Sequence, residues 1–325
     1  MIVSKTPFRV SLFGGGTDFP EYYNKHGGEV VGGSINKYCY ITLRNLHKIQ
    51  DFKYEVHYSK IERVNKINDI EHPVIKACYK IYKIKPFINL IYDADMPAKS
   101  GLGTSSSFTV GLINAINKYS NREISKKELL RQSIHLEKNY LKESVGCQDQ
   151  TFATYGGLNH IKFCKNKILV KKININHNLK KTLESNFFLV FTNNPRFASK
   201  IEKNKILNIK NNLKVFDKIK NLTSLALKNL ESKNDPDEIG LLLNEYWHYK
   251  KELSKQVSHK LINDIYQYGI EGGANGGKIL GAGGGGFLLF YCCKKNQKKF
   301  LKKMNKFAIT KFKFTDNSSR IIHHS

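Results

Sequence analysis

The chain has 325 residues, which is enough for two domains of ordinary size, and 40% of them are hydrophobic, which is compatible with buried cores. The formal net charge of +27 could indicate a nucleic-acid-binding protein, because Lys and Arg neutralise backbone phosphates. Only seven of the 54 basic residues are arginines, however, and the lysines are scattered along predicted helices without gathering beside aromatic residues. We therefore expect no nucleic-acid partner.

The sequence also argues against a membrane or secreted protein. No apolar run approaches the roughly 18 residues that span a bilayer, and the N-terminus has no apolar signal segment. The six cysteines show no CxxC spacing and no paired framework. A reducing compartment suits such a chain best, so we expect a cytoplasmic protein without a membrane partner.

The first half of the chain predicts strands that alternate with helices. Period-2 alternation predicts a strand over 52–58, and the apolar run 87–92 predicts another. Residues 125–128, Ser-x-x-Glu, form a capping box at the start of a helix. Two further strands are expected over 158–163 and 168–170.

The second half of the chain begins with a predicted strand over 187–191. It continues with Lys- and Asn-rich helices to about residue 268 and closes with a strand expected over 307–314. Strands and helices follow no strict βαβ succession, which predicts the α+β class. We place a domain boundary near residue 185, giving domains over 1–185 and 186–325.

A glycine- and hydroxyl-rich loop, Pro-Ala-Lys-Ser-Gly-Leu-Gly-Thr-Ser-Ser-Ser over 97–107, opens onto an apolar helical stretch. The first N–H groups of a helix lack partners and the macrodipole is positive there, so a phosphate is stabilised. Gly101 and Gly103 let the backbone approach a phosphate closely, while Thr104 and Ser105 could donate to it or bind Mg²⁺. A plain helix cap is the competing interpretation. The loop is not of the GxxxxGK[ST] type, because no Lys follows the second glycine.

Two further glycine-rich segments occur, over 7–20 and 276–287. The second contains GxGxxG at 281–286, which could be mistaken for a dinucleotide-binding fingerprint. That fingerprint follows a strand and opens a helix, whereas these glycines precede a strand-like run over 287–291, and the next acidic residue is Asp316. The segment instead indicates backbone that passes close to another loop or to bound phosphate.

In this order, the three segments resemble the signature of the GHMP family of small-molecule kinases, named for galactokinase, homoserine kinase, mevalonate kinase and phosphomevalonate kinase. That family carries an N-terminal substrate motif, a central PxxxGLGSSxx phosphate loop and a C-terminal glycine-rich turn. The resemblance implies a two-domain α+β fold, with a ribosomal-protein-like N-terminal α/β domain and a ferredoxin-like C-terminal domain. It also implies ATP and Mg²⁺ as cofactors and an active site between the domains.

The resemblance implies two catalytic residues. Asp149, in Gly-Cys-Gln-Asp-Gln over 146–150, matches the segment in which galactokinases carry their catalytic Asp. Arg9 occupies the family's catalytic Arg position, where its fixed charge could hold Asp149 ionised or stabilise the transferred phosphoryl group. The competing interpretations are an Asp that caps a loop and an Arg in a strand-edge ion pair.

The resemblance also implies an ATP-binding set and a metal site. The ATP-binding set is Ser100, Gly101, Leu102, Gly103, Thr104, Ser105 and Ser106. Glu137 lies twelve residues before Asp149, at the spacing of the family's Mg²⁺-binding Glu, with Ser105 as the second ligand. An isolated helical Glu beside Lys138 would more often be a solvated surface residue, but the spacing favours the metal-ligand interpretation.

The expected substrate-binding residues are Gly15, Gly16, Thr17, Asp18, Ser34, Arg196, Gly283 and Gly284. Asp18 matches a family Asp that binds sugar hydroxyls. Glycines replace the Glu and His of galactokinase's Gly-Glu-His-Thr-Asp, and the segment is most similar to D-glycero-D-manno-heptose 7-phosphate kinases. Arg196 stands in a run that resembles their Thr-Gly-x-x-Arg-x-Ala-Ser, with Asn193 in place of Gly, and a guanidinium suits a substrate phosphate.

The implied activity is phosphorylation of the anomeric hydroxyl of heptose 7-phosphate, which gives the 1,7-bisphosphate for nucleotide-activated heptose and surface polysaccharide. The expected partners are ATP and a phosphorylated sugar, and a homodimer is possible. Another sugar kinase of the family, acting on fucose or galactose, stays open. So does a non-catalytic nucleotide-binding regulator, although retention of Asp149, Arg9 and Glu137 together argues against it.

Overall fold

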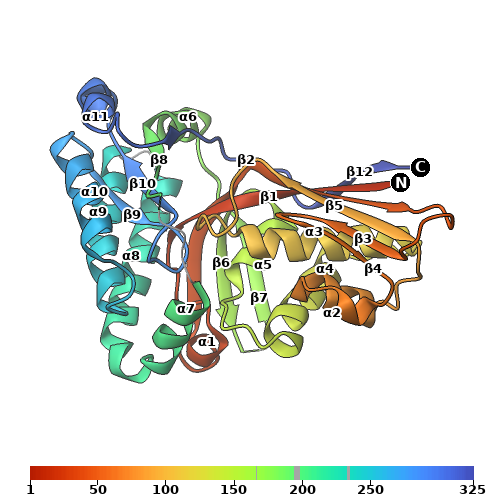
Figure 1. Cartoon of the computed structure of the whole chain (residues 1–325). Helices are drawn as coiled ribbons and strands as arrows, with labels where there is room; N and C mark the ends of the chain where they lie inside the picture. The colour runs from red at the N-terminus through yellow and green to blue at the C-terminus, as the bar shows by residue number, and fades with distance from the viewer. Residues whose placement is uncertain (166, 194–197, 233–234) are drawn as a thin grey trace.

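The computed structural model describes residues 1–165, 167–193, 198–232 and 235–325, and it contains two β-sheets with helices packed on them (Figure 1). The mixed α+β class expected from the sequence is confirmed. Across the described residues, no helix combines the length and the apolar character needed to cross a bilayer.

The first sheet has eight strands in the order β12-β1-β2-β5-β3-β4, with β6 paired to β2 and β7 to β6. All pairings are antiparallel except that of β3 with β5. The strands are β1 (Ile2–Phe13), β2 (Gly28–Asn45), β3 (Tyr54–His57), β4 (Ile61–Val64), β5 (Ile88–Ala94), β6 (Leu158–Cys164), β7 (Lys167–Lys172) and β12 (Arg320–His324).

Helices α2 to α5 cover one face of this sheet (Figure 1). The central helix α3 is buried along most of its length and packs on β1 and β2, which is why its apolar residues are not confined to one stripe. Ser125 caps α4 by accepting from the N–H of Glu128, as the capping box predicts. The helices are α1 (Pro20–His26), α2 (Pro73–Ile81), α3 (Thr104–Tyr119), α4 (Lys126–Ile134), the π-helix η2 (His135–Tyr140) and α5 (Gln148–Tyr155), with a 3₁₀ turn η1 (Ile67–Asp69).

The second sheet has the order β11-β8-β10-β9 and is antiparallel throughout. Its strands are β8 (Phe187–Phe191), β9 (Gly276–Ile279), β10 (Phe287–Tyr291) and β11 (Ile309–Thr310). The accompanying helices are α6 (His177–Asn186), α7 (Ala198–Leu207), α8 (Leu213–Glu231), α9 (Asp237–Glu252), α10 (Lys260–Glu271) and α11 (Gln297–Lys303), with 3₁₀ turns η3 (Lys210–Asn212) and η4 (Lys294–Asn296).

The end of the chain differs from the expected strand over 307–314. Only Ile309 and Thr310 pair with β8, while Phe312 and Phe314 turn their rings into the core against Phe187. The chain then crosses back and forms β12, which pairs with β1 in the first sheet. The last strand of the predicted domain 186–325 is therefore hydrogen-bonded to the first sheet, and the boundary near residue 185 stays a prediction.

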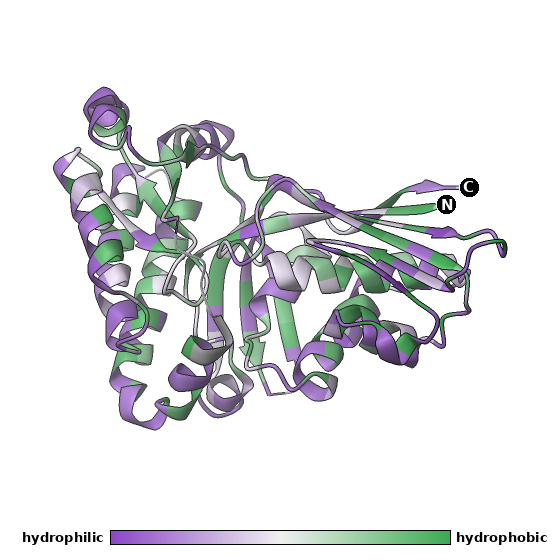
Figure 2. Cartoon of the chain, viewed as in Figure 1, coloured by the Kyte–Doolittle hydropathy of each residue, from purple (hydrophilic) through white to green (hydrophobic). Residues whose placement is uncertain are grey.

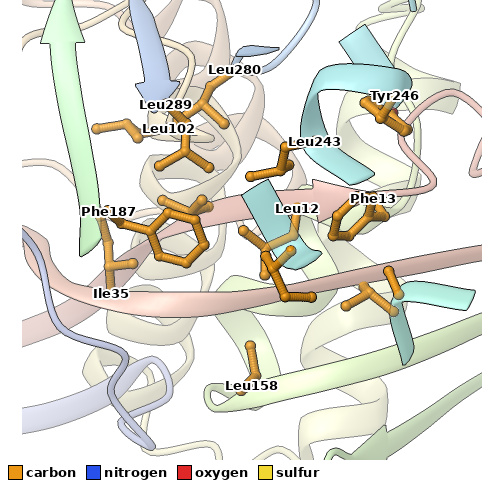
Figure 3. Packing of buried hydrophobic residues seen from close by; sticks show 14 of the residues in the cluster. Leu12, Phe13, Ile35, Leu102, Leu158, Phe187, Leu243, Tyr246, Leu280 and Leu289 are labelled. Carbon is orange, nitrogen blue, oxygen red and sulfur yellow. The ribbon is translucent and has the colours of Figure 1, made fainter. Parts of the chain in front are cut away.

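One hydrophobic cluster joins the two sheets. In Figure 3, Leu12 and Phe13 of β1 lie beside Leu243 and Tyr246 of α9, with Leu280 nearby. Helix α8 also contacts β1 and β2 directly, and α9 contacts β1. In Figure 2, hydrophobic residues concentrate on the strands and hydrophilic ones on the outer sides of the helices. The shared core fixes the two halves against each other and so fixes the cleft between them.

Candidate active site

A cleft of about 750 Å³ opens where β1, the loop before α3, the segment before α5, and elements of the second half meet. Its walls carry groups from six places that are far apart in the sequence. These are Arg9, Ser11, Gly15, Gly16 and Asp18; Lys99 and Gly103–Ser106; residues 141–146, Gln148 and Asp149; Glu202, Lys203 and Lys205; Tyr246 and Lys250; and Lys278, Gly281 and Ala282.

The loop over 97–107 forms the N-terminus of α3, as predicted. Gly103 stands at the N-cap with φ of +73° and makes no side-chain cap hydrogen bond to the first turn of α3. Gly103, Thr104, Ser105 and Ser106 line the cleft, with the Ser105 side chain exposed. The other three expected ATP-binding residues, Ser100, Gly101 and Leu102, are buried behind this surface. They support the loop.

The third glycine-rich segment packs directly on this loop. The N–H of Phe287 donates to the Ser100 carbonyl at 2.9 Å. A Cβ on Gly286 would lie 2.3 Å from that same oxygen, and one on Gly101 would lie 2.9 Å from the Leu280 carbonyl. These glycines are therefore required for close backbone approach between two loops, as the position of GxGxxG before a strand predicts.

Two glycines predicted to bind substrate lie against neighbouring parts of the chain. Gly283 and Gly284 are not among the cleft-lining residues, unlike Gly281. A Cβ at Gly283 would meet the Val257 carbonyl at 2.7 Å, and a Cβ at Gly284 would meet Ile201 at 2.5 Å. Both turn against neighbouring backbone and side chains, so the geometry does not support substrate contact.

Arg9 and Asp149 form a bidentate ion pair beside the phosphate loop. Arg9 Nε donates to Asp149 Oδ1 at 2.8 Å and Nη2 to Oδ2 at 2.7 Å. Arg9 Nη1 also donates to the Gly101 carbonyl at 2.6 Å, which ties the pair to the loop. The Arg9 side chain is only 3% exposed, whereas that of Asp149 is 26% exposed. Asp149 can therefore reach a molecule in the cleft while Arg9 holds its orientation.

Asp18 lies in the first glycine turn and is held by three donors. Oδ1 accepts from the N–H of Gly16 and from Gln148 Nε2, both at 2.9 Å, and Oδ2 accepts from the N–H of Gln148 at 3.1 Å. A Cβ on Gly146 would lie 1.9 Å from Oδ2, so the chain before α5 must be glycine there. Burial raises the pKa of Asp18 to about 6 despite these donors.

Two other predicted substrate residues are structural in this arrangement. The Thr17 hydroxyl donates to the carbonyls of Gly14 and Glu29, and the Ser34 hydroxyl donates to the Phe152 carbonyl at 2.9 Å. Neither residue is among those that line the cleft. Their hydroxyls donate to main-chain carbonyls in the interior, because buried polar groups need hydrogen-bond partners. Gly15 and Gly16 do line the cleft.

The titration of Asp18 gives a testable prediction. We expect its carboxyl group to titrate near pH 6, above its ordinary value of 3.8. The folded state then holds this proton more tightly than the unfolded chain, so the contribution of Asp18 to the free energy of unfolding is fully present below 3.8 and is lost as pH rises through about 6. A carbon-13 NMR titration measures it, with Asp18→Asn assigning the resonance. A midpoint below the ordinary value of 3.8 would mean that the three donors outweigh burial.

Glu137 is buried at 1% exposure on η2, so it is not a solvated surface residue. Oε2 accepts from Ser106 Oγ at 2.9 Å and from the side-chain amide of Gln150, while Oε1 has no hydrogen-bond partner among the described residues. Burial raises the pKa of Glu137 to about 7. The serine that contacts Glu137 is thus Ser106, whereas the predicted metal co-ligand Ser105 faces the open cleft.

The cleft also contains residues that the sequence patterns did not single out. Lys205, Lys250 and Tyr246 come from helices of the second half, and all three are buried. The sequence pattern that could have pointed to two of them is the spacing of Tyr246 and Lys250, which are four residues apart and so lie on the same face of a helix. Arg196, the predicted phosphate contact, lies outside the described residues.

Comparison with known proteins agrees with this geometry. The profile of the GHMP kinases N terminal domain matches residues 70–157, which contain the phosphate loop, Glu137 and Asp149. A D-glycero-alpha-D-manno-heptose 7-phosphate kinase of Campylobacter jejuni is 32% identical over 296 residues, covering 87% of this chain and 86% of that protein. The chain belongs to the GHMP kinase family. It is an ATP-dependent sugar kinase, an enzyme that transfers a phosphoryl group to an alcohol.

More distant GHMP kinases share parts of the sequence or the fold. A galactokinase of Thermotoga neapolitana is 25% identical over 164 residues, which cover 49% of this chain and 45% of that enzyme. The crystal structure of a D-glycero-D-manno-heptose 1-phosphate kinase from Bacteroides thetaiotaomicron superposes with a TM-score of 0.81 at 24% identity, covering 100% of both chains. Lactococcus lactis galactokinase in complex with galactose gives 0.76 at 17% identity, covering 98% and 94%. These two structures establish the GHMP kinase fold.

Proposed function

We propose that this kinase phosphorylates the anomeric hydroxyl of D-glycero-D-manno-heptose 7-phosphate and yields the 1,7-bisphosphate. Its 32% identity to a heptose 7-phosphate kinase over most of both chains supports this choice of sugar. The loss of the Glu and His found in galactokinases, with Gly15 and Gly16 in the cleft wall, leaves room for a sugar larger than galactose. Production of nucleotide-activated heptose in the cytoplasm is the expected role.

The observation that carries the proposal is the Arg9–Asp149 pair beside the phosphate loop. A Cβ on Gly103 would lie 3.2 Å from Arg9 Cγ and 3.4 Å from Asp149 Oδ2, so the carboxylate borders the expected position of the triphosphate. Each oxygen of Asp149 accepts one hydrogen bond from Arg9 and keeps a second lone pair. A sugar hydroxyl can donate to that lone pair, which orients its oxygen toward the γ-phosphorus and receives its proton during transfer.

Other groups of the cleft would bind the ATP phosphates and the sugar hydroxyls and stabilise the transferred phosphoryl group. The first N–H groups of α3 and the hydroxyls of Thr104 and Ser105 would hold the ATP phosphates. Asp18, fixed by Gln148 and Gly16, would accept from sugar hydroxyls. Arg9 compensates the charge of Asp149 and stands next to the transferred phosphoryl group, where its charge opposes the developing negative charge.

The residues around Glu137 fit a Mg²⁺ ion. Mg²⁺ prefers one or two carboxylates with phosphate oxygens and water, and Glu137 Oε1 is a buried carboxylate oxygen without a hydrogen-bond partner among the described residues. Ser106, which contacts Glu137 and lines the cleft, links this carboxylate to the phosphate loop. When bound, the ion would neutralise the charge of the ATP phosphates.

Glu137→Gln gives a prediction for this site. We expect the Mg²⁺ concentration for half-maximal activity to rise about tenfold or more, since loss of even a group that only hydrogen-bonds to a metal ligand costs about 10–100-fold in affinity. Thermal stability should stay equal or rise, because the neutral amide removes a buried carboxyl group whose Oε1 is unpaired. Mn²⁺ binding followed by electron paramagnetic resonance gives a readout apart from activity. Ser106→Ala should raise the Mg²⁺ requirement as well. If only Ser105→Ala raised it, Ser105 would be the second Mg²⁺ ligand, as the family resemblance implies.

The function itself is tested by product analysis. Purified protein is incubated with ATP, MgCl₂ and heptose 7-phosphate, and phosphorus-31 NMR identifies the position of the new phosphate. We expect ADP and a sugar phosphorylated on its anomeric carbon. Transfer to free galactose or fucose, with none to heptose 7-phosphate, would reject the proposed substrate.

A further inference from the structure

Two polar atoms in the cleft wall are buried without a hydrogen-bond partner among the described residues. They are the hydroxyl oxygen of Ser11 and the amide oxygen of Gln148, and both residues line the cleft. Ser11, which is 4% exposed, lies on β1, whereas Gln148 begins α5, so the two come from separate elements. Buried polar groups are nearly always paired, and each exception needs an explanation. A molecule bound in the cleft would provide one for both.

Gly15 brings these two side chains to one point. A Cβ placed on Gly15 would lie 3.6 Å from Ser11 Oγ and 3.4 Å from Gln148 Nε2. The same point lies 3.3 Å from the hydroxyl oxygen of Tyr246. The backbone of Gly15 does not have positive φ, so glycine is not required there by conformation. Its lack of a side chain instead leaves a gap that three polar groups border.

The hydrogen-bonding capacity of this gap suits a hydroxyl group. Gln148 Nε2 donates to Asp18 Oδ1, which leaves the amide oxygen of Gln148 to accept a proton. The Ser11 hydroxyl can donate as well as accept. A sugar hydroxyl can therefore donate to Gln148 Oε1 and accept from Ser11, whereas a phosphate dianion has no proton for the amide oxygen. The Tyr246 hydroxyl donates to the Gly15 carbonyl at 3.0 Å and closes the back of the gap.

The gap lies next to the reacting groups. Gln148 directly precedes Asp149 in the first turn of α5, and Ser11 follows two residues after Arg9 on β1. Arg9 and Asp149 are bound to each other, so the two elements are held together at this point. A sugar that presents one hydroxyl to Asp149 therefore has a neighbouring part of its ring beside Ser11 and Gln148.

We propose that Ser11 and Gln148 bind a second hydroxyl of the sugar, which fits between them because Gly15 has no side chain. The inference rests on the proposed function and deepens it by naming the residues that select among sugars. Both atoms are covered in this structure, so small side-chain rotations align them as the sugar binds, which is common for groups that engage a substrate. A sugar without this hydroxyl leaves both groups unpaired, the condition under which a site discriminates most strongly.

The test uses heptose 7-phosphate and a set of analogues that each lack one ring hydroxyl. With the unmodified enzyme, we expect one analogue to have a kcat/KM about 100-fold or more below that of heptose 7-phosphate. Ser11→Ala should lower kcat/KM for heptose 7-phosphate by about tenfold and leave that for this one analogue within about twofold. Gly15→Ala, whose methyl group fills the gap, should likewise reduce the preference for heptose 7-phosphate over this analogue.

Ser133→Ala is the matched control. Ser133 is a buried serine of α4 outside the cleft wall, and its hydroxyl donates to the Leu129 carbonyl at 2.8 Å. Its replacement should leave kcat/KM for every sugar unchanged and lower the free energy of unfolding, because a paired hydroxyl is lost. Ser11→Ala should not lower the free energy of unfolding, since its hydroxyl has no partner among the described residues. A loss of stability in Ser11→Ala equal to that in Ser133→Ala would mean that Ser11 has a structural role.

Two kinetic results would also overturn the site. One is an equal fall for heptose 7-phosphate and all its analogues in Ser11→Ala, which would mean that Ser11 only shapes the cleft; the other is no fall at all. If Ser11→Ala fails to fold, Gly15→Ala makes the same comparison. Transfer to heptose 7-phosphate with every analogue accepted equally would reject the site and keep the proposed function. Transfer to galactose or fucose alone would reject the proposed function, and single-deoxy analogues of that sugar would then test the site by the same comparison.

Discussion

Asp149→Asn is expected to lower kcat by about 10²- to 10⁴-fold, the range over which a positioned proton acceptor contributes to catalysis. The amide keeps the size of the side chain but neither carries the charge nor accepts the proton of the sugar hydroxyl. It also brings an NH₂ group against the donors of Arg9, so one of the two parallel hydrogen bonds is lost. The Kd of an ATP analogue, measured by calorimetry, should change little, because the α3 N-terminus remains intact.

A double variant separates catalysis from stability. Breaking a buried pair by removing one partner leaves an uncompensated charge, here on Arg9, and costs about 3–5 kcal/mol when both partners are fully buried. Asp149 is 26% exposed, so the cost should be smaller. Arg9→Met combined with Asp149→Asn should recover stability relative to Asp149→Asn and remain inactive. Recovery of activity in the double variant would show that Asp149 only compensates Arg9.

The phosphate loop was predictable because its chemistry is local. A strand, a Gly-Leu-Gly turn and an apolar helix are adjacent in the sequence, and β5, Gly103 and α3 appear in that order in the structure. The contact between Arg9 and Asp149 is not local, and it was expected only through the family resemblance. The function of GxGxxG was inferred from its place before β10, because a glycine run that precedes a strand cannot open a helix.

Residues within a correctly identified motif could not be sorted into those that face the cleft and those that support it. Thr17 and Asp18 are neighbours, yet the Thr17 hydroxyl closes hydrogen bonds to Gly14 and Glu29 while Asp18 faces the cleft. Ser34 is likewise turned inward, to Phe152. Side-chain direction at a turn depends on tertiary neighbours, and those neighbours lie far away in the sequence.

The lysines of the cleft illustrate a second limit. The sequence around Lys205 and Lys250 does not distinguish them from the many other lysines of the chain. They are buried because α7 and α9 pack against the segment 279–282 that follows β9, where their ammonium groups donate to main-chain carbonyls. The prediction of a closing strand over 307–314 was wrong for a related reason. The run Ile-Thr-Lys-Phe-Lys-Phe over 309–314 is typical of a strand, but Phe312 and Phe314 pack into the hydrophobic core against Phe187 and do not continue the pairing with β8.

Gly286→Ala is expected to separate the two glycine turns that build the ATP side of the cleft. The added Cβ would lie 2.3 Å from the Ser100 carbonyl oxygen and 2.6 Å from its carbon, and both atoms are backbone. Gly286 also has φ of +88°, which strains any side chain, and its carbonyl accepts from the N–H and hydroxyl of Thr192. We expect a loss of about 3–5 kcal/mol in the free energy of unfolding, from backbone strain plus overpacking.

The same substitution should raise KM for ATP about tenfold or more, since displacement of Ser100 moves the N-terminus of α3 that holds the phosphates, and small misplacements of positioning groups are costly. Gly27→Ala is the matched control: it has φ of +64°, but the nearest atom to its Cβ lies 4.0 Å away. It should cost only the strain, about 1–3 kcal/mol, and leave KM for ATP unchanged. Denaturant unfolding and steady-state kinetics measure both. If the two variants lost equal stability and kept equal KM values, then the close approach of the two turns would not be what shapes the ATP site.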